Sequence, residues 1–152
     1  MIKVMFVCLG NICRSPMAEF ILKDMVKKQN LENKFIINSS ATSYEEIGND
    51  MYRCAKEILD EKNIKYNKRK AVRLTFEDYN NYDFIIGMEK SNVENIKKIA
   101  DKNDKIYKLL DFTNNPKDII DPWYSRNFEM TYNEITEGCK GFLQYLKDKK
   151  LI

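Results

Sequence analysis

The sequence predicts an α/β fold: a single doubly wound domain, residues 1–152, built on a four-stranded parallel sheet with helices on both faces. Short β-prone apolar runs alternate along the chain with longer segments in which apolar residues recur every three or four positions. The first run is apolar at almost every residue, as expected of a strand covered on both faces. A chain of 152 residues, 43% of them hydrophobic, has the size at which one core forms.

The first half of the chain contains two strand–helix units. Residues 2–7 (IKVMFV) predict the first strand. The helix after it begins at Ser15, as its N-cap, has Pro16 in its first turn and continues to about residue 29. Residues 35–39 (FIINS) predict the second strand. The second helix is indicated by an apolar stripe of Met51, Ala55, Ile58 and Leu59.

The second half repeats the alternation. Residues 83–88 (DFIIGM) predict the third strand, and a helix bearing Val93, Ile96 and Ile99 follows. Residues 106–109 predict a short fourth strand. A long C-terminal helix has an apolar face of Ile135, Cys139, Phe142, Leu143 and Leu146. In such a sheet ligands bind beyond the carboxyl ends of the strands, so we expect the site there.

Composition argues against several classes of partner. The 26 basic and 23 acidic residues are intermixed, so no nucleic-acid partner is expected. The basic run 68–70 is interpreted as solvent-exposed, with contact to an anionic substrate as the alternative. The apolar start is too short for a membrane span or signal peptide, which predicts no membrane partner and a cytoplasmic location. We expect four free thiols, no metal site, since histidine is absent, and no cofactor.

The segment between the first strand and the first helix has the layout of a phosphate-binding loop. A loop that enters a helix N-terminus turns several backbone N–H groups toward one point, where an anion can bind. A glycine and an asparagine inside it favour backbone conformations that other residues avoid. We therefore predict a phosphate-binding loop of Leu9, Gly10, Asn11, Ile12, Cys13 and Ser15, between Cys8 and the helix.

The two ends of this loop carry reactive groups. Cys8 opens the loop, where the helix dipole and the amide groups favour its thiolate, which can attack phosphorus. The planar fork of Arg14 can hold two phosphate oxygens. Ser15 can donate its hydroxyl to the sulfur and ease the departure of the thiolate. The alternative for Cys8 is a small, inert side chain packed in the core.

The run Val7–Pro16 resembles the signature of the low-molecular-weight protein tyrosine phosphatases, and the likeness covers nearly the whole chain. Residues 83–89 with Asn92 resemble the third strand and following helix of that family, and residues 121–124 (DPWY) resemble its Asp-Pro-aromatic-aromatic loop. The resemblance implies hydrolysis of phosphotyrosine-containing proteins. It also implies that Cys8 is the nucleophile, Arg14 the phosphate clamp and Asp121 the general acid and base.

Further expectations follow from the resemblance. Trp123 and Tyr124 resemble one wall of a cleft that accepts an aryl ring, with packing as the alternative. At the rim, Glu45 and Glu46 replace a family Trp-His pair, which suggests a preference for neutral or basic sequence around phosphotyrosine. The family also implies a reversible disulfide between the two loop cysteines, with a packed Cys13 as the equal alternative. Arg69 replaces a family histidine.

Other functions of the same fold remain open at this stage. Arginine phosphatases of this type carry threonine where this chain has Ile12, which favours phosphotyrosine. Arsenate reduction needs a further cysteine pair between about residues 80 and 90, and none is present. A phosphocysteine carrier would not need Asp121, and a noncatalytic phosphate-binding module would not need a thiolate. We expect a monomer.

Overall fold

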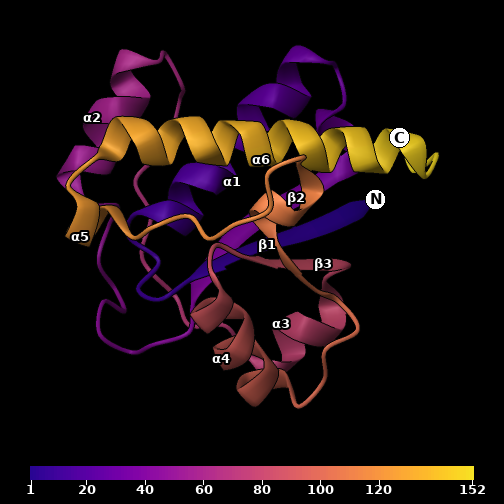
Figure 1. The fold of residues 1–152 in the computed structure, drawn as a ribbon, viewed down its shortest axis with the longest axis horizontal. Helices are drawn as coiled ribbons and strands as arrows, with labels where there is room; N and C mark the ends of the chain where they lie inside the picture. The colour runs from indigo at the N-terminus through magenta and orange to yellow at the C-terminus, as the bar shows by residue number, and fades with distance from the viewer.

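The computed structural model describes residues 1–152 and has a parallel four-stranded sheet at its centre (Figure 1). The strands lie in the order β2-β1-β3-β4, and every neighbouring pair is parallel. The predicted fold class is therefore confirmed. β1 lies inside the sheet and carries Cys8 to its carboxyl edge. The strands are β1 (Ile2–Cys8), β2 (Phe35–Ala41), β3 (Phe84–Gly87) and β4 (Ile106–Lys108).

Helices cover both faces of the sheet (Figure 1). The larger core cluster includes Val4, Phe6 and Cys8 of β1 and lies beneath α1 (Arg14–Lys28), α2 (Arg53–Glu61) and α6 (Phe128–Asp148). Met5 and Val7 point to the opposite face, into a smaller cluster with α3 (Phe76–Asn81) and α4 (Lys90–Ala100). This alternation explains why β1 is apolar along its length: both of its faces are buried.

Short 3-10 and α-helical turns complete the chain. They are η1 (Glu32–Lys34), η2 (Leu109–Phe112) and α5 (Pro122–Ser125). Helix α6 passes very close to η2. The approach is so close that a Cβ at Gly141 would overlap the carbonyl oxygen of Phe112. None of the helices combines the length and apolar character that a membrane crossing requires.

The structure corrects several element boundaries. Helix α1 begins at Arg14 with Cys13 as its N-cap, so the prediction that Ser15 is the N-cap is wrong. The reason is that the Ser15 hydroxyl lies 3.0 Å from the Cys8 sulfur and is not used to cap the helix. Met51 is buried but lies before the start of α2. The fourth strand ends one residue earlier than predicted, because Leu109 begins η2. Helices α3 and α5 were not predicted.

Candidate active site

The loop after β1 forms the floor of a cleft of about 180 Å³ at the carboxyl edge of the sheet. Three segments far apart in the sequence meet there: this loop, the segment after β2 and the start of α5. Predicted site residues from all three segments line the cleft. The lining residues are Cys8, Leu9, Gly10, Ile12, Cys13, Arg14, Glu45, Glu46, Asp121, Trp123 and Tyr124. Asn11 and Ser15, both buried, support the loop from below.

The sulfur of Cys8 is almost completely buried and faces hydrogen-bond donors. The residue is 3% exposed, and its Sγ accepts the backbone N–H of Asn11 at 3.3 Å. Ser15 Oγ lies 3.0 Å from the same sulfur. Asn11 adopts the left-handed conformation expected of it, with φ of 60°. Gly10 does not have a positive φ, contrary to expectation, and its close neighbour is the side chain of Glu46, whose Cγ would lie 3.2 Å from a Cβ.

Arg14 is held in place by two acceptors on neighbouring segments. Its side chain is 2% exposed, and Nη1 donates to Glu89 Oε2 at 2.9 Å and to the carbonyl oxygen of Ile119 at 2.8 Å. Nη2 lies 3.7 Å from Asp121 Oδ2. Glu89 caps α4 at the end of β3, so the sheet edge places its carboxylate against the guanidinium. Sequence reasoning missed this role, although a glutamate directly after a buried strand was a signal.

Asp121 enters the cleft from the loop that follows η2. Its Oδ1 accepts the backbone N–H of Trp123 at 3.0 Å, which caps α5 and leaves Oδ2 on the side of Arg14. The backbone N–H of Ile119 donates to the carbonyl of Met88 at 2.9 Å, which ties this loop to the end of β3. Asp121 therefore lines the same cleft as the loop that carries the sulfur.

The aromatic wall of the cleft is exposed and braced from outside. Trp123 is 48% exposed and Tyr124 78% exposed. Tyr52 packs edge-on against Trp123, with ring centroids 5.5 Å apart, and the Arg126 guanidinium lies 4.8 Å from the Trp123 centroid. Glu45 is exposed on the rim, which matches its predicted position at the cleft.

A hydrogen-bond network lies beneath the loop and begins at Arg69. Its Nη2 donates to the carbonyl oxygen of Asn11 at 2.7 Å and also to Asn11 Oδ1. The amide of Asn11 donates to Ser15 Oγ at 2.7 Å and to Ser39 Oγ at 3.0 Å. Ser39 Oγ in turn donates to Glu19 Oε1 at 2.6 Å. The interpretation of Arg69 as merely solvent-exposed is therefore wrong, because the fold brings its guanidinium onto the loop, 58 positions away from Asn11 in the sequence.

The remaining cysteines are free thiols with different surroundings. Burial raises the pKa of Cys13, and the neighbouring Cys8 and Asp121 act in the same direction, so this thiol stays protonated at neutral pH. Cys139 is fully buried, and burial raises its pKa as well. Cys54 was expected to be buried, because its position in the sequence lies on the apolar face of the predicted second helix, but it is only partly buried.

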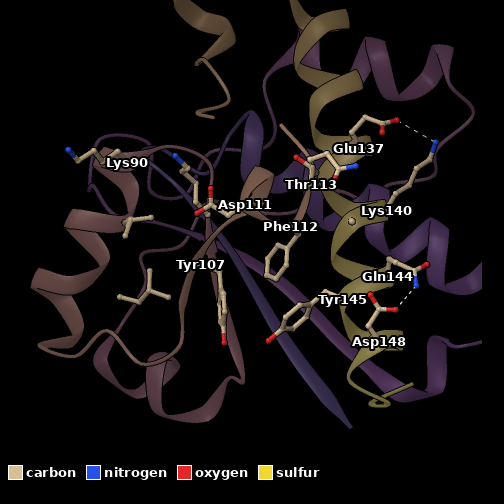
Figure 2. A pocket seen from close by; sticks show the side chains of 15 residues that line it. Lys90, Tyr107, Asp111, Phe112, Thr113, Glu137, Lys140, Gln144, Tyr145 and Asp148 are labelled. Carbon is tan, nitrogen blue, oxygen red and sulfur yellow. Dashed lines mark hydrogen bonds and ion pairs between the residues drawn. The ribbon is translucent and has the colours of Figure 1, made fainter. Parts of the chain in front are cut away.

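A larger groove of about 1040 Å³ lies on another part of the surface, between η2 and α6. Figure 2 shows Tyr107, Phe112 and Tyr145 gathered in it, with polar side chains of α6 paired along one side. The groove is lined by neither a cysteine nor an arginine. Of these two cavities, the smaller cleft is the one that holds both a thiol and a guanidinium.

The cleft defines a class of site: a buried thiol in the loop that leads into a helix N-terminus, a fixed guanidinium beside it, and a carboxyl group 3.7 Å from that guanidinium. Residues 3–151 match the family described as low molecular weight phosphotyrosine protein phosphatase. The chain is 36% identical to the low molecular weight protein-tyrosine-phosphatase PtpA of Staphylococcus aureus, over 99% of this chain and 98% of PtpA. The chain therefore belongs to the low molecular weight phosphotyrosine protein phosphatase family, which makes it a protein-tyrosine phosphatase.

Solved structures agree with this assignment. YfkJ from Bacillus subtilis superposes with a TM-score of 0.95 at 36% identity, covering 99% of this chain and 97% of YfkJ. The low molecular weight protein tyrosine phosphatase SP-PTP from Streptococcus pyogenes superposes with a TM-score of 0.86 at 40% identity, covering 96% of this chain and 93% of SP-PTP.

Proposed function

We propose that this protein hydrolyses phosphotyrosine in proteins through a phosphocysteine intermediate on Cys8, with Arg14 binding phosphate and Asp121 as general acid and base. The observation that carries the proposal is the convergence of all three side chains on one cleft. The groups around the sulfur stabilise an anionic nucleophile, and the buried, fixed guanidinium of Arg14 stabilises an anionic substrate beside it.

In the first step the thiolate of Cys8 attacks phosphorus in line with the aryl oxygen. The S–P bond forms, the P–O bond to the ring breaks, and Asp121 gives its proton to the departing phenolate oxygen. The guanidinium of Arg14, already oriented by Glu89 and the carbonyl of Ile119, holds the equatorial phosphate oxygens. A positioned carboxylic acid typically contributes about 10² to 10⁴ in rate to such a step.

In the second step the carboxylate of Asp121 takes a proton from water, and the water oxygen attacks phosphorus. The O–P bond forms, the S–P bond breaks, and phosphate leaves together with a regenerated thiolate. The thiolate needs stabilisation as a leaving group, and the N–H of Asn11 and the hydroxyl of Ser15 supply it.

The cleft walls favour an aryl phosphate. Trp123 and Tyr124 offer ring faces on one side, and Leu9 and Ile12 add apolar surface from the loop. A phosphate on a short serine side chain would reach the sulfur only by drawing the peptide backbone into the cleft. The alternative substrate, phosphoarginine, would gain less from this apolar lining because its guanidinium is polar.

The rim supports a preference among phosphotyrosine sites. Glu45 and Glu46 lie at the mouth of the cleft and would repel acidic residues beside phosphotyrosine. We expect kcat/KM to be higher for neutral or basic flanks and the difference to shrink in a Glu45→Gln variant. Peptide kinetics that favoured acidic flanks would refute this preference without affecting the mechanism.

The experiment that tests the mechanism is release of phosphate from an aryl phosphate by the purified protein. Cys8→Ser should abolish turnover, and Asp121→Ala should lower kcat much more than it weakens binding. A stable phosphoenzyme with little free phosphate would instead indicate a phosphoryl carrier. Hydrolysis of phosphoarginine in preference to phosphotyrosine would overturn the substrate assignment.

The proposal includes a cytoplasmic monomer that acts on phosphorylated proteins. The chain has a mass of 18.1 kDa, so sedimentation of a single species near that mass would support the monomer. A species of twice that mass would refute it.

A further inference from the structure

Arg126 lies directly after the helical turn that forms the aromatic wall of the cleft. It is the C-cap of α5 in the left-handed conformation, with φ of 59°, and its backbone N–H donates to the carbonyl of Pro122 at 2.9 Å. The next residue, Asn127, is the N-cap of α6, and its Oδ1 accepts the backbone N–H of Met130 at 2.9 Å. The backbone that carries Arg126 is therefore held by a helix end on each side.

The side chain of Arg126 lies over the indole of Trp123. Its Cζ is 4.8 Å from the ring centroid, and Tyr52 packs edge-on against the same indole with centroids 5.5 Å apart. Trp123 also lines the cleft, so one indole joins this cation to the proposed binding place of the phosphotyrosine ring. The donors of a guanidinium lie in its plane, so contact through its face leaves them free to bind an acceptor.

None of these donors is used within the protein. The residue is exposed, and its side chain makes neither a hydrogen bond nor an ion pair with any other residue. This sets Arg126 apart, because every other arginine contacts an acceptor in the chain. Those arginines are Arg14, Arg53, Arg69 and Arg73. A positioned guanidinium with free donors beside a substrate cleft is complementary to a carboxylate.

A peptide whose phosphotyrosine ring packs on Trp123 brings its neighbouring residues close to Arg126. Consecutive Cα atoms are only about 3.8 Å apart, so a carboxylate one or two residues from phosphotyrosine can reach the guanidinium. Glu45 is the other exposed charge of the rim, and it comes from the segment after β2. No ion pair joins Glu45 to Arg126, so each charge is free to act on the substrate separately.

We infer that Arg126 is a specificity-determining residue that binds the carboxylate of an aspartate or glutamate flanking phosphotyrosine in the substrate. The planar fork of the guanidinium can take both carboxylate oxygens. The inference rests on the proposed function, and it gives the flank near α5 a preference opposite to that proposed for the flank near Glu45. The favoured substrate therefore has an acidic residue on one side of phosphotyrosine only.

The test measures binding rather than turnover. Each peptide carries a phosphonate mimic of phosphotyrosine that cannot be hydrolysed, with a single glutamate moved along the neutral residues on either side, and fluorescence anisotropy gives Kd. Glutamate should lower Kd by about threefold at the position that meets Arg126, the size of an exposed ion pair with good geometry. Arg126→Gln should remove this gain and leave Kd of the neutral peptide unchanged. Arg126→Lys should keep only part of the gain, because an ammonium lacks the planar fork.

Arg53→Gln is the matched control. Arg53 begins α2 next to Tyr52, is exposed, and pairs with Glu57 at 3.5 Å. Its removal deletes the same charge without taking a guanidinium from the indole. The gain from glutamate should therefore be the same in Arg53→Gln as in the unmodified protein. An equal loss of that gain in both variants would show a general effect of positive charge and would overturn the inference.

A purely structural role for Arg126 gives a different pattern. If Arg126 only braces Trp123, Arg126→Gln should weaken the neutral peptide and the glutamate peptides by the same factor. That pattern, or glutamate that gives no gain at any position in the unmodified protein, would overturn the inference. Hydrolysis of the matched phosphotyrosine peptides is measured separately. Binding with the expected position dependence but without hydrolysis would support the inference and sink the proposed catalysis, whereas failure of every peptide to bind would overturn both.

Discussion

Removal of the carboxylate that orients Arg14 should weaken catalysis without touching substrate. Glu89 Oε2 accepts from the guanidinium at 2.9 Å, and the only other close acceptor of that nitrogen is the Ile119 carbonyl at 2.8 Å. A hydrogen bond to a charged group contributes about 1.5 to 3 kcal/mol. Glu89 is 27% exposed, so water replaces part of the interaction and the low end, about 1.5 kcal/mol, applies.

If that free energy is expressed in the transition state, Glu89→Ala should lower kcat/KM by about tenfold. Glu89→Gln keeps an oxygen acceptor in the same place, so it should lose only about threefold. Steady-state hydrolysis of an aryl phosphate measures both variants. Glu94→Ala, an exposed change on the same helix, is the control and should match the unmodified protein.

The result that would refute this reasoning is equal loss in Glu89→Ala and Glu89→Gln. It would show that the negative charge, rather than the hydrogen bond that orients Arg14, is what matters. Full activity in Glu89→Ala would show that the Ile119 carbonyl suffices to hold the guanidinium.

Three further predictions concern stability and oxidation. Gly141→Ala should lower the free energy of unfolding by about 2 kcal/mol, and Tm by roughly 4–8 °C, because the new methyl group overlaps the Phe112 carbonyl. Burial acts to raise the pKa of Asp50, but hydrogen bonds, of which the one from Lys56 is the largest, lower that pKa overall. The free energy of unfolding that Asp50 contributes is present above the pKa of an unfolded aspartate, about 3.9, and is lost as pH falls through the lower pKa of the folded state. Asp50→Asn should therefore make the stability of the protein depend less on pH in the acid range. Peroxide should convert the nucleophilic sulfur to a sulfenic acid that condenses with Cys13, releasing water, and Cys13→Ser should lose recovery by added thiol.

Each of these outcomes has a direct check. If Gly141→Ala has the same Tm as the unmodified protein, then α6 is able to shift away from η2. An acid midpoint that does not change in Asp50→Asn would mean that the carboxyl is unperturbed. Equal recovery with and without Cys13 would exclude the disulfide as the protective species.

The buried parts of the fold were predictable because their signals are local. β1 is apolar throughout, and the stripes of α1, α4 and α6 repeat at helical spacing, so strand and helix positions follow from pattern alone. Helix α3 was missed because it has six residues and buries only Tyr79. Its signal was the capping box formed by Thr75 and Asp78, which a search for apolar stripes overlooks.

The active-site loop could be predicted in the same way, because its chemistry lies within eight consecutive residues. The groups that support it could not. Glu89 is 75 residues from Arg14, and Arg69 is 58 residues from Asn11, so only the folded sheet brings them together. The wrong N-cap has a related cause: a serine at a helix start usually caps it, but Ser15 is bound to the sulfur.

The cap that Asp121 places on α5 joins the proposed proton donor to the aromatic wall of the cleft. Oδ1 of Asp121 is bonded to the backbone of Trp123, so the carboxyl group and the indole belong to one short turn. Any outward swing of that turn that lets the dephosphorylated phenol escape would also withdraw the acid. Release of the first product and suspension of proton transfer would then be a single mechanical event, and the turn would have to return before water could be activated.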